Sequence, residues 1–165
     1  AVIDAAACID DGRPSCFQIA HRFIIDTGCG SDMVTRALAE AFEAYYLAMP
    51  QILFNTANGQ KWAHEALQVN VACFKTTACP YLMKSTPAIL SIGMRVLNEC
   101  YNFIWLNGKI PCVITDVFDA VPLEVTNNVP YITPTTQPEA DNNKLAAKCG
   151  IVVKNKRIII LNYSV

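Results

Sequence analysis

The sequence predicts a mostly β fold with one or two short helices. The apolar residues, 53% of the 165, come in short runs such as residues 23–25 and 158–161, and runs of this length are typical of buried strands. Asn58-Gly59 and Asn107-Gly108 each separate two such runs. An Asn-Gly pair is the strongest short hairpin signal, because both central residues of a type I′ turn need a positive φ. Many short strands with regular turns indicate a barrel or a sandwich.

The strands follow from the apolar runs and from the turn residues between them. Asn58-Gly59 and Asn107-Gly108 would each close a hairpin, and Lys154-Asn155-Lys156 would close a third near the C-terminal end of the sequence. In chain order, we expect strands over residues 5–9, 17–26, 51–54, 61–74, 88–92, 101–106, 110–115, 151–153 and 157–161.

Two segments are expected to be helical. The better one covers residues 32–48, where apolar residues recur near helical spacing and Ser31 or Asp32 can cap the first turn. Pro50 lies just past its expected end. The second is a short helix over residues 94–99.

Composition excludes several classes of protein. Thirteen basic and fourteen acidic residues give a net charge of -1, which is not the charge pattern of a protein that binds nucleic acid or an anionic membrane. The apolar runs are shorter than the roughly 18 residues that a membrane span needs. The sequence starts without the basic and apolar regions of a secretion signal, so we expect a cytoplasmic location.

The cysteines do not form a metal-binding pattern. No two are spaced as Cys-x-x-Cys, and His21 and His64 are the only histidines, so we expect no metal site. Several cysteines lie in apolar runs, where they behave as small buried hydrophobic residues. We expect free thiols in a reducing compartment, although spacing leaves any disulfide connectivity open. The eight are Cys8, Cys16, Cys29, Cys73, Cys79, Cys100, Cys112 and Cys149.

The candidate chemistry lies where an apolar strand ends in Asp26, Thr27 and Gly28. Burying an unpaired carboxylate is costly, but a second carboxylate beside it could share one proton. One carboxylate of such a pair acts as a base toward water, and the other acts as an acid toward a substrate carbonyl. The alternative is an ordinary Asp-Thr-Gly turn after a strand, which the tripeptide alone favours.

Three ordered segments carry a resemblance to a known family. In their order and spacing, the chain resembles the retropepsin-like aspartic proteases, especially those of retrotransposons, over residues 17–115. Leu90-Ser91-Ile92-Gly93, with Cys100-Tyr101-Asn102-Phe103 soon after it, is similar to retroelement proteases in particular. The segments are Phe23-Ile24-Ile25-Asp26-Thr27-Gly28, Phe54-Asn55-Thr56-Ala57-Asn58-Gly59 and Ala88-Ile89-Leu90-Ser91-Ile92-Gly93.

The resemblance implies a retropepsin-like closed barrel with a flap hairpin, and a homodimer that cleaves a peptide or polyprotein without a cofactor. Asp26 would be one half of a catalytic dyad shared by two protomers. Thr27 would form a hydrogen bond across the dimer, and the Gly28 backbone would meet the substrate. The substrate contacts would be Cys29, Ala57, Asn58, Gly59 and Ile92. For Ile92, packing in the core is an equal alternative.

Other readings of the sequence remain. Cys29 and Gly30 stand where the family commonly has alanine and then a small hydroxylated or acidic residue, which leaves a catalytically weak or inactive dimerisation module as an alternative. An unrelated β-rich binding domain is another. A pairing of Cys29 with a histidine has no motif to mark it. Asp116 and Asp119 could supply an internal second carboxylate, but neither is followed by Thr-Gly or Ser-Gly.

The expected organisation has one main domain. Residues 17–132 would form the protease domain, after an N-terminal extension or interface strand at 1–16. A loop containing prolines at 133–143 would lead to a C-terminal β segment at 144–165. We expect its strand over residues 157–161 to lie in the dimer interface, and the alternative is that it pairs within its own chain.

Overall fold

The computed structural model describes residues 3–4, 17–19, 21–56 and 59–161. Strands account for 44% of the chain and helices for 20%, which confirms a mostly β fold. Three α-helices are present in the described part, where one or two were expected. Among the described residues, no helix combines the length and the apolar character that crossing a membrane requires.

The elements are short apart from the two strands of one long hairpin. The α-helices are α1 (Arg36–Ala39), α2 (Ile92–Asn98) and α3 (Asn142–Cys149), and the 3-10 helices are η1 (Glu40–Tyr45) and η2 (Ala72–Phe74). The strands are β1 (Ile3–Asp4), β2 (Gln18–Ile19), β3 (Phe23–Asp26), β4 (Met33–Thr35), β5 (Leu47–Thr56), β6 (Gly59–Ala66), β7 (Val69–Val71), β8 (Thr76–Ala78), β9 (Tyr81–Met83), β10 (Ile89–Ser91), β11 (Asn102–Ile104), β12 (Cys112–Ile114), β13 (Ala120–Pro122), β14 (Glu124–Thr126), β15 (Val129–Ile132), β16 (Ile151–Lys154) and β17 (Arg157–Ile160).

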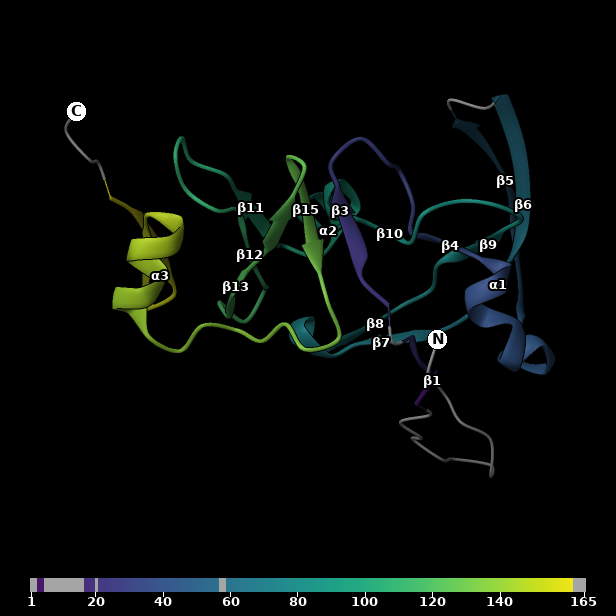
Figure 1. The fold of residues 1–165 in the computed structure, drawn as a ribbon, viewed down its shortest axis with the longest axis horizontal. Helices are drawn as coiled ribbons and strands as arrows, with labels where there is room; N and C mark the ends of the chain where they lie inside the picture. Colours follow the sequence, from purple (N-terminus) through teal and green to yellow (C-terminus); the bar gives the residue numbers. More distant parts are fainter. Residues whose placement is uncertain (1–2, 5–16, 20, 57–58, 162–165) are drawn as a thin grey trace.

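The largest sheet has eight strands in the order β14-β15-β3-β10-β4-β9-β6-β5. Its two ends, β14 and β5, do not pair with each other in the described part of the chain, so the sheet is open. The expectation of a closed barrel is therefore not met. Figure 1 shows why: the β5–β6 hairpin lies at one end of the sheet, away from β14 and β15.

Strand β3 lies inside this sheet. It runs parallel to β10, with Ser91 level with Asp26, and antiparallel to β15, with Tyr131 level with Ile24. Figure 1 shows β3 between these two neighbours. Since Phe23 and Ile25 are buried, the alternation of the strand fixes which face it turns toward the core.

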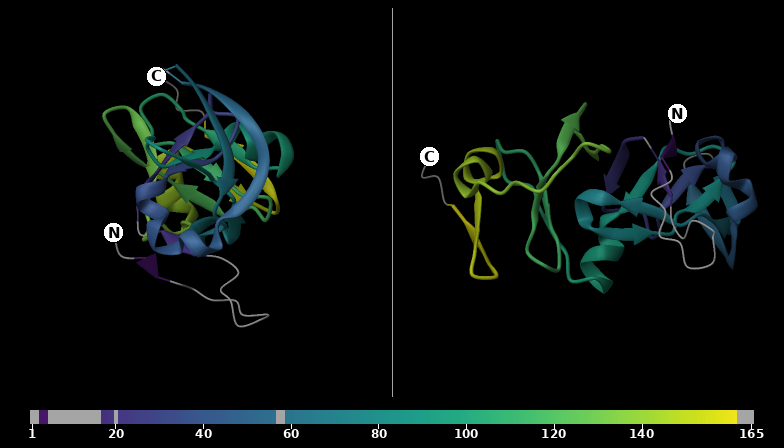
Figure 2. Two further views of the ribbon diagram at one scale, coloured as in Figure 1. Left: turned by 90° about the vertical axis from the view of Figure 1, so that its right-hand side faces the viewer. Right: turned by 90° about the horizontal axis from the view of Figure 1, so that it is seen from below.

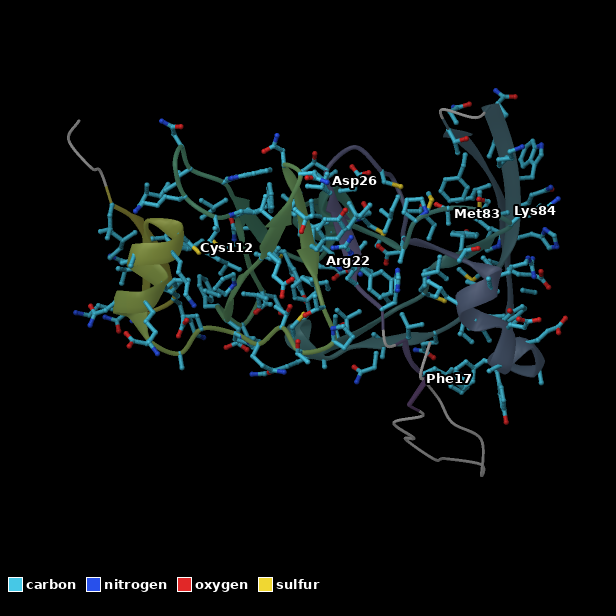
Figure 3. All side chains as sticks on the ribbon, viewed as in Figure 1. Phe17, Arg22, Asp26, Met83, Lys84 and Cys112 are labelled. Atoms are coloured by element: carbon cyan, nitrogen blue, oxygen red, sulfur yellow. The ribbon has the colours of Figure 1, made fainter. Side chains whose placement is uncertain are left out.

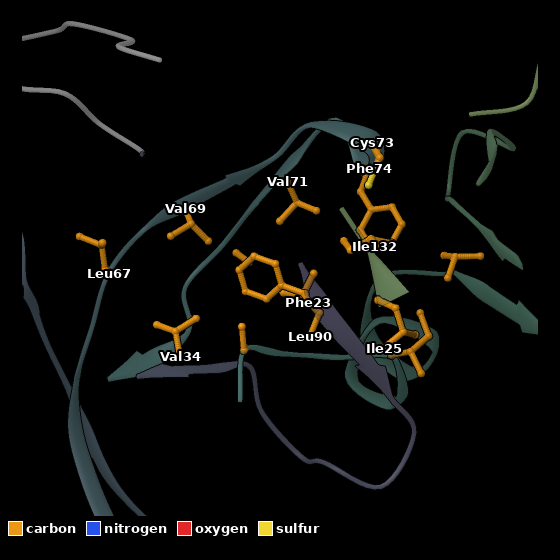
Figure 4. Packing of buried hydrophobic residues seen from close by; sticks show 14 of the residues in the cluster. Phe23, Ile25, Val34, Leu67, Val69, Val71, Cys73, Phe74, Leu90 and Ile132 are labelled. Atoms are coloured by element: carbon orange, nitrogen blue, oxygen red, sulfur yellow. The ribbon is translucent and has the colours of Figure 1, made fainter. Parts of the chain in front are cut away.

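The main core is formed by apolar side chains from both halves of the sheet and from the loops that cover it. Figure 4 shows Phe23 and Ile25 of β3 with Leu90 of β10 and Ile132 of β15 in this cluster. Two strands that are distant in sequence, β10 and β15, thus bury their side chains together with β3, the strand that ends in Asp26. Asp26 therefore directly follows a buried core residue.

A second core lies toward the C-terminal end of the chain. The sheet β11-β12-β13, helix α3 and the β16–β17 hairpin enclose it, with Cys112, Leu145 and Ile151 fully buried. Figure 2 shows α3 and this hairpin at the end of the molecule opposite the β5–β6 hairpin. All six described cysteines are free thiols, and Cys112 and Cys149 belong to this second core.

The helix expected over residues 32–48 is confirmed only over residues 36–45, which α1 and η1 cover. Residues Met33–Thr35 form β4, which pairs with β9 and β10, and α1 and η1 together end at Tyr45. The gain from pairing with the sheet outweighs the local helical spacing of a few apolar residues. Pro50 lies within β5, at a register shift between Ala48 and Ile52.

Two long strands expected from the sequence are each divided. Residues 17–26 contain β2 and β3, and residues 61–74 contain β6, β7 and η2. The expected strand at residues 5–9 lies outside the described residues. Residues 133–141 form no helix or strand, and α3 begins at Asn142 inside the expected loop, with Asp141 as its N-cap. The segment expected to be β over residues 144–165 therefore starts with a helix, and its strands are β16 and β17.

The three expected hairpins are present. β5 pairs with β6, β11 with β12 and β16 with β17, each antiparallel. Strand β17 therefore pairs within its own chain, which is the second of the two alternatives for this segment. Asn155 and Lys156 have φ values of 51° and 55°, as a two-residue hairpin turn requires.

Candidate active site

The candidate site is built around Asp26, at the carboxyl end of β3. Its carboxylate is half-buried, and the backbone N–H of Gly28 donates a hydrogen bond of 2.7 Å to Asp26 Oδ1. This bond fixes the orientation of the carboxylate at the start of the loop that follows. Figure 3 shows Asp26 near the upper end of β3. Thr27 and Gly28 are exposed in the single chain, where they are accessible to a substrate or a second copy.

The loop after Asp26 is held by a buried ion pair that links Asp32 to Arg95 of α2. Arg95 donates from two nitrogens to the two carboxylate oxygens of Asp32, at 2.7 and 2.9 Å. The two side chains are 1% and 3% exposed. A planar guanidinium and a carboxylate fit each other in this two-bond geometry, which makes the link directional as well as strong.

Asp32 does not cap a helix, as the sequence had allowed. Its buried Oδ1 also accepts a hydrogen bond of 2.7 Å from the backbone N–H of Ser91. Burial works against the charge of Arg95, but its hydrogen bonds to Asp32 outweigh that cost and raise the pKa of Arg95. Arg95 therefore keeps its charge, and the bonds of Asp32 to Ser91 and Arg95 tie the loop to both β10 and α2.

Ser91 makes the second link between the loop and α2. Its hydroxyl donates to the carbonyl of Cys29 and accepts a hydrogen bond of 3.1 Å from the N–H of Met94, which caps α2. Because Ser91 lies level with Asp26 in the parallel β3–β10 pair, both links act beside the candidate catalytic carboxylate.

Gly93 allows α2 to approach the same loop closely. A Cβ at Gly93 would lie 3.1 Å from the carbonyl oxygen of Thr27. A Cβ at Gly30 would meet nothing within 4 Å. The two glycines thus differ: the close contact with Thr27 requires a glycine at position 93, whereas Gly30 lies in open space.

We expect Gly93→Ala to displace the loop after Asp26 by a few tenths of an ångström, because the added Cβ would lie 3.1 Å from the Thr27 carbonyl oxygen. For the aspartic mechanism proposed below, which depends on where the Asp26 carboxylate lies, kcat/KM should fall about tenfold. The substitution should also destabilise the fold by about 1–3 kcal/mol, as overpacking does. Gly30→Ala is the matched control and should retain activity. Peptide-cleavage kinetics and denaturant unfolding measure both variants. Equal effects of the two substitutions would contradict this role for Gly93.

Cys29 lies between the loop and the base of the β5–β6 hairpin. Its thiol donates to the carbonyl of Ser31 at 3.0 Å, and its side chain packs against a cluster that includes Phe54, Tyr81 and Met83. Burial raises the pKa of Cys29, the bond to Ser31 opposes this, and the nearby carboxylate charge of Asp26 adds to it. A thiol that is protonated at neutral pH is a poor nucleophile, which counts against a cysteine protease.

The β5–β6 hairpin packs one face on this apolar cluster, through Met49, Ile52 and Phe54 of β5 and Ala63 of β6, so the contact reaches close to the turn. Phe54 and Ala63 are buried in the cluster, and the Phe54 ring packs edge-on against Tyr81 with centroids 5.7 Å apart. Toward its turn, the hairpin has Thr56 level with Gly59, whose φ is +91°. Ala57 and Asn58, two of the expected substrate contacts, lie outside the described residues.

The other sequence candidates fall in different places. Ile92 is 1% exposed and belongs to the main core, so in this chain it supports the loop from below and has no surface for a substrate. Asp116 is exposed in the turn between β12 and β13, and Asp119 forms an ion pair with Lys75 at 2.7 Å. Both lie in the turn of another sheet, which gives no support to an internal dyad.

Comparison with protein-family models, with curated proteins and with solved structures finds no significant match to this chain. The resemblance to retropepsins therefore stays a prediction, and the geometry around Asp26 carries the functional argument. Sequence reasoning missed the ion pair of Asp32 and Arg95. The available signal was an arginine one turn after Ser91, in a helix that starts where a buried strand ends.

Proposed function

We propose that this chain is one protomer of a homodimeric, retropepsin-like aspartic endopeptidase. Two copies of Asp26 would activate a water molecule that attacks the carbonyl of a peptide bond. One carboxylate takes a proton from the water while the other gives a proton to the carbonyl oxygen. A polyprotein of a retroelement is the substrate that the sequence resemblance implies.

The observation that supports this proposal best is how firmly the structure holds a half-buried carboxylate. Asp26 ends strand β3, which pairs with β10 on one side and with β15 on the other. Its loop is joined to α2 by the Asp32–Arg95 pair and by Ser91. A simple turn after a strand would not need a buried ion pair to hold it. General acid–base catalysis benefits from a loop that is held in this way, because the rate depends on where the proton-transferring groups lie.

The long β5–β6 hairpin supports the proposal as a candidate flap. Ile52 and Phe54 of the hairpin share an apolar cluster with Cys29 of the loop after Asp26, and the residues between Phe54 and the turn are exposed on both strands. A hairpin of this kind could close over a peptide and exclude water from the reaction. The shared apolar cluster would then lie beside the bound peptide.

We expect the outer part of the β5–β6 hairpin to gain protection from amide hydrogen exchange when a peptide inhibitor binds. Few buried contacts hold this part, so it should open easily in the free protein. The inhibitor should be a peptide that carries a hydroxyl group in place of the scissile carbonyl. Exchange at β12 and β13 serves as the internal control and should not change. The same exchange rate at the hairpin with and without the inhibitor would contradict its role as a flap.

The direct test is a peptidase assay on the full chain. Cleavage of a peptide library at acidic pH, unaffected by metal chelators and blocked by the same inhibitor, is the expected result. A stable dimer with a tightly held Asp26 and no cleavage would support the alternative, a dimerisation or binding module on the same fold.

A further inference from the structure

We propose that a cavity between η2, the end of α2 and the turn from β12 to β13 binds an organic cation, which is a guanidinium or a primary ammonium group on an apolar stem. Arginine and lysine side chains carry these groups, and so do small free amines. The cavity lies at the end of α2 opposite the turn that contacts the loop after Asp26. The site is therefore independent of the proposed function, and peptide cleavage at Asp26 makes no use of it.

Three segments that are distant in sequence line the cavity. They are residues 74–76 at the start of β8, Glu99 and Tyr101 after α2, and residues 116–117 in the β12–β13 turn. The volume of the cavity is about 440 Å³. Sites for small ligands typically have volumes of roughly 300–1,000 Å³, so a ligand of the size of an amino acid fits here.

The most buried residues of the lining are aromatic. Phe74 and Tyr101 are 2% and 4% exposed, and their rings pack edge to face with centroids 5.6 Å apart. Both belong to the main core, which holds them in place. They give the cavity an apolar inner surface against which the stem of a ligand can pack, and aromatic rings also attract cations.

The walls of the cavity are held in place by the fold. An ion pair of 2.7 Å between Lys75 and Asp119 joins the segment after η2 to the β12–β13 turn. The N–H of Thr115 donates to the Asp119 carbonyl at 3.0 Å and closes that turn. At the end of α2, the N–H of Glu99 donates to the Arg95 carbonyl at 2.9 Å. A cavity that is already formed costs little ordering entropy when a ligand binds.

The cavity carries negative charge. Glu99 at the end of α2 and Asp116 in the β12–β13 turn both line it. Lys75 is the one cation of the lining within the described part of the chain, and its ammonium lies 2.7 Å from a carboxylate oxygen of Asp119. That ion pair leaves Glu99 and Asp116 as surplus charge. Two surplus carboxylates attract a cation and repel an anion.

Arg95 does not offset this charge. Its two terminal nitrogens both donate to Asp32, which already balances the guanidinium. Its Nε lies 4.0 Å from Glu99 Oε2, which is too far for a hydrogen bond, and has no hydrogen-bond partner among the described residues. The Glu99 side chain is 38% exposed, so its carboxylate is accessible to a ligand.

The hydroxyl of Tyr101 is the observation that points to a ligand. This residue lines the cavity and is 4% exposed, yet its hydroxyl has no hydrogen-bond partner in the part of the chain that the structure describes. Buried hydroxyls normally have such a partner. Burial, together with the nearby charges of Glu99 and Asp116, raises the pKa of Tyr101 to about 12. At neutral pH the group is therefore a neutral hydroxyl, whose oxygen can accept a hydrogen bond from the N–H of a bound cation.

A metal ion fits this cavity less well than an organic cation does. Calcium takes about six to eight oxygen ligands, and magnesium requires a nearly octahedral set. The described residues contain no group of three or more His, Cys, Asp or Glu side chains that could hold a metal ion. Two carboxylates and a hydroxyl beside buried rings instead suit a cation that has several N–H donors and an apolar stem, as arginine has.

Calorimetric titration of the full chain with matched probes tests the site. N-acetyl-arginine amide carries the guanidinium, N-acetyl-citrulline amide replaces it with a neutral group of similar shape, and 1,4-diaminobutane represents the free amines. We expect the arginine probe to bind about tenfold or more tightly than the citrulline probe, because hydrogen bonds to charged groups are the stronger ones. Equal affinities of these two probes, or no binding of either cationic probe at millimolar concentration, would overturn the inference.

The same titration distinguishes the two sources of the cation. Tighter binding of the capped arginine than of the diamine supports a basic side chain of a polypeptide as the natural ligand. Tighter binding of the diamine supports a free amine. Either result requires the charge that the citrulline probe lacks.

Tyr101→Phe removes the unpartnered hydroxyl and nothing else. Because no described group bonds to it, thermal unfolding should not change, whereas the arginine probe should bind about tenfold more weakly. Glu99→Gln should weaken binding by a similar factor. Glu124→Gln, at an exposed carboxylate of β14, is the matched control and should leave the dissociation constant unchanged. Full affinity in both Tyr101→Phe and Glu99→Gln would place the cation elsewhere and refute the assignment.

NMR chemical shifts locate the probe without any substitution. Amide signals of residues 74–76, 99–101 and 115–118 should move when N-acetyl-arginine amide is added, and those of residues 23–28 should not. Shifts confined to residues 23–28 would instead make the probe a substrate mimic at Asp26 and overturn this site. A chain that cleaves no peptide but binds the probe in the cavity would overturn the proposed function and leave the cation site standing.

Discussion

Replacing Asp26 with asparagine should abolish peptide cleavage and leave the fold unchanged. The amide has the shape of the carboxylate and can still accept the hydrogen bond from the Gly28 N–H, which measures 2.7 Å. It cannot take or give the proton on which the reaction depends. In a homodimer both halves of the dyad change together, so we expect a loss of about 10²–10⁴-fold or more in kcat/KM. Cleavage kinetics and thermal unfolding of the same preparation measure the two effects.

Asp116→Asn is the control for this variant, because Asp116 is an exposed carboxylate in the β12–β13 turn. It should cleave at the unchanged rate. Mixing the unchanged chain with an equal amount of Asp26→Asn adds a test of the shared dyad, since only about a quarter of the dimers then carry two aspartates. Full activity of Asp26→Asn, or of every mixture, would end the case for an aspartic dyad.

Arg95→Met should be the most destabilising single substitution around the site. Asp32 would keep its buried position, 3% exposed, without the guanidinium that now neutralises it. Removing one partner of a buried ion pair typically costs about 3–5 kcal/mol, because the remaining charge is left uncompensated. Unfolding in denaturant measures this loss, and activity should fall with it because the loop after Asp26 loses its attachment to α2.

Lys75→Met provides the comparison with an exposed ion pair. Lys75 and Asp119 are 2.7 Å apart, but the lysine side chain is 67% exposed. Solvent screens such a pair, so its loss should change the free energy of unfolding by less than about 1 kcal/mol. If Arg95→Met cost no more than Lys75→Met, the buried pair would not be what holds the catalytic loop.

Local signals in the sequence were enough to predict the hairpins. Asn155 and Lys156 take the positive φ values that their two-residue turn requires, at 51° and 55°, and the strands on either side pair as expected. At Asn107-Gly108 only Gly108 has a positive φ, at 69°, and the paired strands stop at Ile104 and Cys112, so this hairpin has a longer loop than the predicted type I′ turn. A turn of a few residues brings its own flanks together, so no distant residue has to be known. Helix α3 could have been predicted in the same way, because Asp141 caps its start and Gly150 ends it with a φ of 71°.

The first turn of the helix expected over residues 32–48 is a strand for the opposite reason. Met33 and Val34 have an apolar spacing that fits a helix, but in the structure they pair with Tyr81 and Leu82 of β9. Strand β15 went unpredicted although it lies next to β3, since Pro130 in a short apolar run argues against a strand. In both cases the partner strand lies more than forty-five residues away in the sequence.

The sequence by itself determined that an apolar strand ends in Asp26, and that hairpins form at the Asn-Gly turns and near the C-terminal end. These features depend on residues that are neighbours along the chain. Only the tertiary structure decided what surrounds Asp26: the parallel pairing with β10 and the buried bond from Arg95 to Asp32. Arg95 and Asp32 are 63 residues apart, and a pattern of residue types does not specify which distant groups meet. That choice follows from the strand register and the packing of the whole core, which bring α2 against the loop.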